Sequence, residues 1–196
     1  MKIHEFFRLV NLQEPLYCVH GDIFKTPAKH IAFAVNYPDK KGNYCNEGGF
    51  AGEVLEKHWP ELGSIRFTKG EPISRYSNGK YWHALPVHTN EADGWEETPG
   101  LIESCLNKLP VNSTEVVTCV LIGGGVAGKK WGANIKNIGG MLSSIKTIVL
   151  YVYEADMFQL LVGTGIVAAC LYHGKVKQLR ALNGESIEEV RKFVVV

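Results

Sequence analysis

The sequence predicts an α/β protein, a three-layer α/β/α arrangement in which helices cover both faces of a mixed sheet. Apolar strand-like runs alternate with amphipathic helical segments, which is the pattern of such folds. The runs are apolar throughout, as expected for strands buried on both faces. With 196 residues and 45% hydrophobic residues, the chain suits one large domain. We expect a main domain over 1–161 and a C-terminal extension over 162–196, a hairpin and a short helix packed on that domain.

The strands of the sheet are predicted from short apolar runs bounded by turn residues. A turn at Ser77-Asn78-Gly79 precedes one of these runs. The predicted strands are Leu16–His20, Ile31–Val35, Tyr81–Val87, Val116–Ile122 and Thr147–Tyr153.

Helices are predicted from the spacing of apolar residues and from start and stop signals. The segment Gly48-Gly49-Phe50-Ala51-Gly52 opens the first, the stretch GEVLEKHW, and Pro60 stops it. The second covers Thr98–Leu109, with Thr98 as its N-cap and Pro99 in its first turn. The third runs from about Ala133 to Ser144.

Composition and charge narrow the possible roles of the chain. A formal net charge of +1 predicts no specific nucleic-acid partner. No apolar run approaches the roughly 20 residues of a membrane span, and the N-terminal residues lack a signal-peptide core, so we expect a cytoplasmic protein without a membrane partner. The five cysteines are scattered, which predicts reduced and mostly buried thiols and no metal site.

Glycine-rich segments follow two of the predicted strands and precede two of the predicted helices. They are Gly48-Gly49-Phe50-Ala51 and the stretch Gly123 to Gly128. Backbone N–H groups in such loops, followed by a helix N-terminus, form an anion cradle. Each loop alone could be a tight turn, but two loops at equivalent strand ends favour a diphosphate held between them. Neither is a Walker motif, and the formal GxGxxG match lacks the acidic residue expected about 20 positions later.

At this point the chain resembles the macro domain family. The resemblance rests on GDIFKTPAKHIAFAVN, EGGFAGEVLEKHWPEL, VLIGGGVAGKKWGANIKNIGGML and IVLYVYE, in that order, over about residues 16–161. The segment IGGGVAGKKWGANI looks most like the branch with ADP-ribose-1''-phosphate phosphatases and ADP-ribosyl-ester hydrolases. The resemblance implies binding of ADP-ribose or a derivative, with an ADP-ribosylated protein as a further possible partner and no cofactor.

The resemblance also implies roles for individual residues. Asp22 would accept a hydrogen bond from the adenine amino group, assisted by the Ile23 backbone, although a turn or helix-cap aspartate is the alternative. Asn36 would meet the distal ribose, unless it only ends a strand. Tyr153 would lie beside the adenine, with core packing as an equal alternative. The two phosphate loops would be Gly48, Gly49, Phe50 and Ala51, and Gly124, Gly125, Val126, Ala127 and Gly128.

Departures from the family pattern concern catalysis. The usual Asn-Ala-Ala-Asn stretch reads Phe33-Ala34-Val35-Asn36, and Ala127 stands where the hydrolase branch has an aspartate. His88 falls near that branch's lysine and, with Asn36, is the best catalytic candidate, because an imidazole titrates near neutral pH. A surface histidine is the alternative for His88. The hypotheses are therefore a phosphatase or hydrolase acting at the terminal ribose, a non-catalytic ADP-ribose-binding module, and an NAD-dependent or nucleotide-sensing protein.

Overall fold

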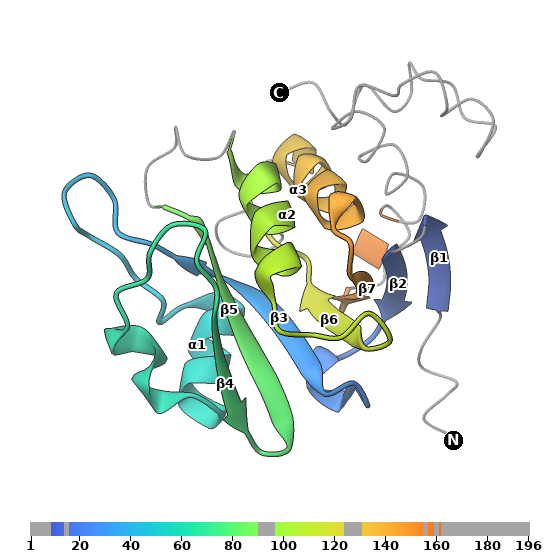
Figure 1. Cartoon of the computed structure of the whole chain (residues 1–196), viewed down its shortest axis with the longest axis horizontal. Helices are drawn as coiled ribbons and strands as arrows, with labels where there is room; N and C mark the ends of the chain where they lie inside the picture. Colours follow the sequence, from blue (N-terminus) through green and yellow to red (C-terminus); the bar gives the residue numbers. More distant parts are fainter. Residues whose placement is uncertain are drawn as a thin grey trace.

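The computed structural model describes residues 9–13, 16–89, 97–123, 131–154, 157–158 and 161. Within them a seven-stranded sheet has the order β1-β2-β7-β6-β3-β5-β4 (Figure 1). The edge strands β1 and β4 run antiparallel to their neighbours and the five strands between them are parallel, so the sheet is mixed as predicted. The strands are β1 (Leu9–Gln13), β2 (Leu16–His20), β3 (His30–Asn36), β4 (Ile73–Ser77), β5 (Lys80–His88), β6 (Val116–Val120) and β7 (Thr147–Val152).

Helices cover both faces of this sheet. α2 (Thr98–Lys108) and α3 (Trp131–Ser143) lie side by side on one face (Figure 1). α1 (Gly49–Lys57) and the 3-10 helix η3 (Pro60–Ser64) cover the other, and a short 3-10 helix, η2 (Ile23–Lys25), follows β2. The predicted three-layer α/β/α architecture is therefore confirmed. None of the helices in the described part of the chain is long and apolar enough to cross a bilayer.

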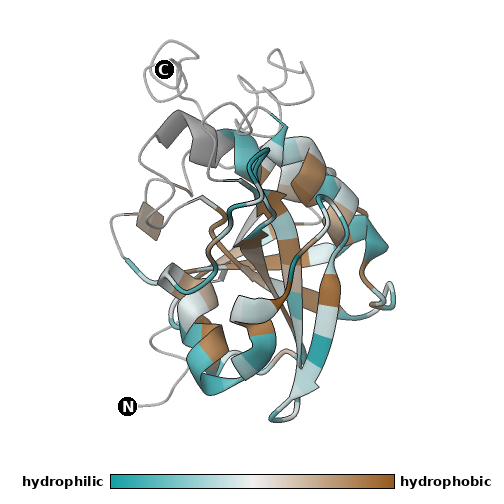
Figure 2. Cartoon of the chain, turned by 90° about the vertical axis from the view of Figure 1, so that its left-hand side faces the viewer, coloured by the Kyte–Doolittle hydropathy of each residue, from teal (hydrophilic) through white to brown (hydrophobic). Residues whose placement is uncertain are grey.

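The inner strand β3 is apolar because its side chains are buried on both faces of the sheet. Its side chains alternate between the two faces. Ile31 and Phe33 pack in the layer that contains α1, whereas Ala32 packs in the layer that contains α2 and α3, and all three are fully buried. Figure 2 shows hydrophobic residues along the strands and hydrophilic ones on the outer turns. The sheet thus holds a separate core on each face.

The contact between α2 and α3 depends on a glycine. A Cβ atom at Gly140 of α3 would lie 2.2 Å from the carbonyl oxygen of Pro99 in α2. Glycine inside a helix is unfavourable by about 1 kcal/mol relative to alanine. Its presence here is explained by the close backbone approach that it permits.

Two details differ from the predictions. Thr98 is the first residue of α2 and Glu97 is the N-cap, so the prediction of Thr98 as N-cap is wrong. Its hydroxyl instead donates to the carbonyl oxygen of Val87 at the end of β5, at 3.2 Å. The edge strands β1 and β4 were not predicted. The predicted extension over 162–196 lies outside the described residues.

Candidate functional site

Two neighbouring cavities lie at the carboxyl ends of the parallel strands. The Asp22 pocket, of about 580 Å³, is bordered by Asp22, Ile23 and Tyr153. The Asn36 pocket, of about 390 Å³, is bordered by Asn36 and His88. Both volumes fall in the range of about 300–1,000 Å³ that is typical of small-molecule sites. Because Phe50 and Val120 line both cavities, the two cavities are adjacent, and together we call them a two-part cleft.

Asp22 enters its pocket from the turn after β2. The ends of β2 and β7 are tied together, since Gly21 N–H donates to the Val152 carbonyl at 2.8 Å. The Asp22 carboxylate accepts a hydrogen bond from Phe24 N–H at 3.0 Å and lies 3.7 Å from the Lys25 ammonium. Asp22 therefore caps η2 and also lines the pocket, so its two suggested roles are compatible.

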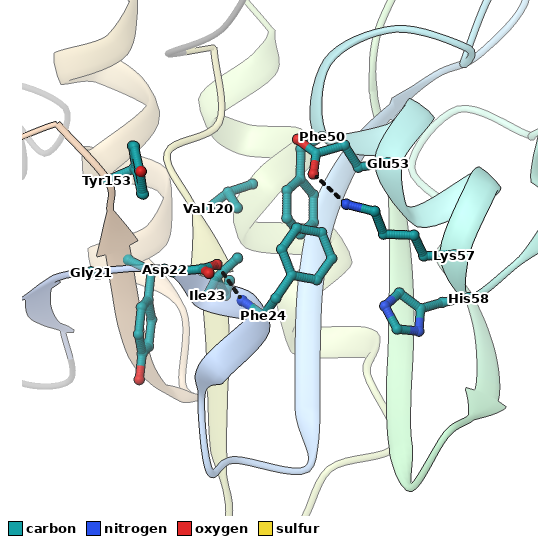
Figure 3. A pocket seen from close by; sticks show the side chains of 11 residues that line it. Gly21, Asp22, Ile23, Phe24, Phe50, Glu53, Lys57, His58, Val120 and Tyr153 are labelled. Carbon is teal, nitrogen blue, oxygen red and sulfur yellow. Dashed lines mark hydrogen bonds and ion pairs between the residues drawn. The ribbon is translucent and has the colours of Figure 1, made fainter. Parts of the chain in front are cut away.

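Tyr153 borders the same pocket just after β7. Its side chain is 79% exposed, so the alternative of core packing is wrong. Figure 3 shows Tyr153 on one side of the pocket, with Phe24 and Phe50 facing it from the other. Ile23, between them in the lining, is buried. An exposed aromatic ring beside a carboxylate is a surface on which a flat base can stack.

The wall opposite Tyr153 contains the predicted Phe50, but its other aromatic and charged side chains, Phe24, Glu53 and Lys57, were missed from the sequence. The rings of Phe24 and Phe50 are 5.1 Å apart, and the Lys57 ammonium lies 5.0 Å from the centre of the Phe24 ring. Lys57 pairs with the Glu53 carboxylate at 3.1 Å (Figure 3). A signal did exist, because Phe50, Glu53 and Lys57 are spaced i, i+3 and i+7 and share one face of α1.

His58 ends this wall. Its ring stacks on Trp82 with 4.2 Å between ring centroids, and it also lines the Asp22 pocket. Burial lowers the pKa of His58, and the nearby ammonium groups of Lys57 and Lys80 lower it further. The lowered pKa favours the neutral imidazole, and its Nδ1 lies 3.2 Å from the side-chain amide nitrogen of Asn78.

Asn36 and His88 come together through an irregularity in the sheet. Val35 of β3 pairs with Pro86 of β5, but the next residue, Asn36, pairs with His88, so Val87 is the extra residue of a bulge. Proline lacks the N–H that a regular ladder needs, which is why it occurs at such points. The bulge places the two catalytic candidates opposite each other at the pocket.

His88 is 7% exposed, so the alternative of a surface histidine is wrong. Burial lowers the pKa of His88 to about 4. The imidazole is thus neutral at pH 7, and it titrates well below the near-neutral range expected from the sequence. In its neutral form it can accept a proton but cannot supply one as an imidazolium.

The first glycine loop forms the opposite border of the Asn36 pocket. Gly48 is the N-cap of α1, and Gly49 has φ +58°, a left-handed conformation that favours glycine. Gly48, Gly49, Phe50 and Ala51 all line the pocket. The N–H groups in the first turn of a helix have no intrahelical partners, and the helix dipole is positive there. This border can therefore receive an anion.

Of the second glycine loop, Gly123 to Gly128, the described residues include Gly123. Gly123 is buried, has φ +83° and lines the Asn36 pocket together with Leu121 and Ile122. The structure therefore brings the start of the second loop to the same cavity as the first. The predicted contacts at Gly124, Gly125, Val126, Ala127 and Gly128 lie outside the described residues.

Of the four cysteines in the described residues, three are buried in the core. Burial raises the pKa values of Cys18, Cys105 and Cys119 to about 12, so these thiols are inert. Cys45 is exposed and lines the Asn36 pocket. In the described ranges, no three or more His, Cys, Asp or Glu side chains gather as a metal site would require.

His83 is fully buried in β5 and is part of the protein core. It forms hydrogen bonds with His30 at 3.0 Å and with the Ser74 hydroxyl at 2.6 Å.

No protein family model matches the chain, and no curated protein matches it. Solved structures do. The chain is similar to Thermosipho africanus DarTG in complex with ADP-ribose, with TM-score 0.56 and 17% identity, over 82% of this chain and 48% of that one. It thus spans about half of the DarTG chain.

Two further structures have similar folds. One is a mutant form of the Oceanobacillus iheyensis macrodomain, with TM-score 0.50 and 15% identity, over 89% of this chain and 94% of that one. The other is an alphavirus P23pro-zbd structure, with TM-score 0.51 and 14% identity, over 82% of this chain and 24% of that one. Together with the mixed sheet, the three layers and the cleft at the strand ends, these similarities show that the chain has the macrodomain fold.

Proposed function

We propose that the chain binds ADP-ribose along the two-part cleft. The adenine occupies the Asp22 pocket, and the diphosphate and terminal ribose occupy the Asn36 pocket. The observation that carries this proposal is the shared wall of Phe50 and Val120, which joins a carboxylate-bearing pocket to one bordered by a helix N-terminus. The similar DarTG structure was solved with ADP-ribose, which supports this choice of ligand.

The chemistry of each pocket suits one part of the ligand. A carboxylate only accepts hydrogen bonds, so Asp22 matches the amino group of adenine, and Tyr153 offers a ring for stacking. Among the described residues that line the Asn36 pocket, none is Lys, Arg, Asp or Glu. The diphosphate would therefore be held by the backbone N–H groups of Gly49, Phe50 and Ala51 and by the dipole of α1.

Calorimetric titration with ADP-ribose, AMP and NAD tests the proposal. ADP-ribose should bind more tightly than AMP, because AMP lacks the second phosphate and the terminal ribose. Equal or tighter binding of NAD would favour a nucleotide-sensing role instead. Absence of binding by any of the three would contradict the proposal.

A matched pair of variants tests the adenine contact. Asp22→Asn keeps an oxygen that can cap η2 but places an N–H donor near the adenine amino group. It should weaken ADP-ribose binding by about 1–3 kcal/mol. Lys25→Ala removes the exposed partner of Asp22 without altering the pocket lining, and should bind normally. Equal effects of the two changes would reject the assignment of Asp22.

Hydrolysis at the terminal ribose is a second candidate function, favoured by the pairing of Asn36 with His88 at the Asn36 pocket. In this reaction Asn36 would orient the terminal ribose while neutral His88 accepts a proton from the attacking water. The water oxygen would bond to the substituent on the terminal ribose as the bond between substituent and ribose oxygen breaks, and the proton would pass from His88 to that departing oxygen. The lack of a carboxylate in the described lining favours the alternative of a non-catalytic module.

Two assays would distinguish a hydrolase from a non-catalytic binding module. One measures phosphate released from ADP-ribose-1''-phosphate, and the other measures ADP-ribose released from an ADP-ribosylated protein. If turnover occurs, a His88→Ala variant with full activity would remove His88 from the mechanism.

A further inference from the structure

The loop between Asn36 and Gly48 is pinned by polar side chains at its tip and at its root. At the tip, the Asp39 carboxylate accepts hydrogen bonds from the N–H groups of Lys41 and Asn43, both at 2.8 Å. These bonds, Asn43 first, lower the pKa of Asp39. The tip therefore holds itself together and lies outside the lining of either pocket.

At the root, Asn46 clasps the backbone of Asn36. Asn46 is 3% exposed. Its Oδ1 accepts from Asn36 N–H at 2.6 Å, and its Nδ2 donates to the Asn36 carbonyl at 3.1 Å. One amide group thus satisfies both backbone groups of the residue that ends β3. If the Asn46 amide were flipped, its NH2 group would face the Asn36 N–H and its oxygen would face the Asn36 carbonyl. Only the orientation in the structure is therefore compatible with both hydrogen bonds.

The clasp also controls the Asn36 side chain. Asn36 Nδ2 donates to the carbonyl oxygen of Cys45 at 2.6 Å, and Cys45 directly precedes Asn46. Because Asn46 fixes its own stretch of the loop against β3, it also fixes the carbonyl that orients the Asn36 amide. Backbone and side chain of Asn36 are held by neighbouring residues of the loop.

We infer that Asn46 is a positioning residue that presents Asn36 to the terminal ribose of ADP-ribose. The inference rests on the proposed function. It adds a residue that makes the protein prefer ADP-ribose to ADP, which lacks the terminal ribose. Holding Asn36 before the ligand arrives reduces the rotamer freedom that binding must remove. Asparagine suits this role because an ionised aspartate would oppose the Asn36 carbonyl, and a serine could not reach both backbone groups.

The first test compares ADP-ribose with ADP, which lacks the terminal ribose. Asn46→Ala should weaken ADP-ribose binding about tenfold, because a buried N–H and carbonyl lose their partners. ADP binding should stay within about twofold, because its diphosphate is held by the backbone N–H groups at the start of α1 and not by the Asn36 side chain. A loss shared equally by both nucleotides would show a merely structural role and overturn the inference. Asp39→Ala, which loosens the tip alone, is the control and should keep the preference for ADP-ribose.

The second test uses Asn46→Asp and pH. An ionised carboxylate can accept from Asn36 N–H but repels the Asn36 carbonyl, whereas a protonated one donates and accepts as the amide does. Because position 46 is buried, the charged form of an aspartate there is disfavoured, so the preference for ADP-ribose over ADP should be weak at pH 8 and recover toward pH 5. The titratable neighbours are Cys45, Glu47 and His88, and the wild-type protein measured over the same range corrects for them. His88 stays neutral there because burial holds its pKa at about 4. A variant whose preference does not change with pH would contradict the clasp.

The outcomes separate this inference from the proposed function. If the wild-type protein binds neither nucleotide, or binds both equally, the proposed function fails and the role of Asn46 fails with it. If the wild-type protein prefers ADP-ribose and Asn46→Ala keeps that preference, the inference alone is overturned.

Discussion

The stability of the fold should fall as the pH drops from neutral to about 5, mainly because of two buried histidines; the lowered pKa of the more exposed His58 acts in the same direction. His83 and His88 are 0% and 7% exposed. Burial lowers the pKa of each to about 4, and the neighbouring His30 contributes to the shift of His83. In the unfolded chain both would titrate near 6.5. Between these values the unfolded state binds more protons, so stability is greatest above about pH 7 and is lost as the pH falls through that window.

The size of the effect follows from the two pKa values. Each histidine contributes about 2 kcal/mol of lost stability at pH 5 relative to pH 8, and the pair about 4 kcal/mol. The exposed carboxylates of Asp39 and Glu115 also have lowered pKa values, but from starting values of 3.8 and 4.5 they act at more acidic pH. The interval from pH 7 to 5 therefore reports the histidines.

Urea unfolding followed by circular dichroism at several pH values measures this. His83→Gln and His88→Gln should each remove about half of the pH dependence, because a glutamine does not titrate. A wild-type stability that is constant from pH 5 to 8 would refute the reasoning. So would two variants whose pH dependence equals that of the wild type.

Further predictions concern the glycines and Tyr153. Gly140→Ala should lower the free energy of unfolding by about 1–3 kcal/mol, because the added Cβ would meet the Pro99 carbonyl; a rise in melting temperature, as helix propensity alone predicts, would contradict this. Gly123→Ala should destabilise by about 1–2 kcal/mol, since its φ of +83° is strained for alanine; unchanged urea unfolding would count against that conformation. Tyr153→Ala should weaken ADP-ribose and ADP by similar amounts, about 1 kcal/mol by calorimetry, without changing stability, because the ring is 79% exposed; normal affinity would remove Tyr153 from the site.

The buried part of the fold was predictable because burial leaves a clear pattern. The parallel strands are apolar on both faces, and the helices have one apolar face, so these elements and their order along the chain were predictable, whereas the order of strands in the sheet was not predicted. β4, Ile-Ser-Arg-Tyr-Ser, is an edge strand whose Ile73 and Tyr76 are exposed. It has no alternation that marks a buried face. The turn after it was predictable, because Asn-Gly is a sequence typical of tight hairpin turns. The structure has the positive φ angles of such a turn at Asn78 and Gly79.

The candidate site was predictable where it depends on strand ends. Asn36 ends a parallel strand, and Asp22 and Gly123 follow parallel strands, whose carboxyl ends meet at one edge of a sheet. Phe24, Lys57 and His58 reach the cleft only because of how α1 and η2 lie against the sheet. The burial of His88 depends on a bulge, and the clasp of Asn46 depends on the path of a loop. Such features arise from tertiary packing and have no local pattern.

The central claim is that both pockets hold a single ligand at once, and amide chemical shifts measured during titration with ADP-ribose test it most directly. Ile23 lines the Asp22 pocket alone, and Ala51 and Gly123 line the Asn36 pocket alone, so their amide signals report the two pockets separately. We predict that the signals of both groups shift together and give the same dissociation constant. Shifts confined to one group, or two different constants, would contradict the claim.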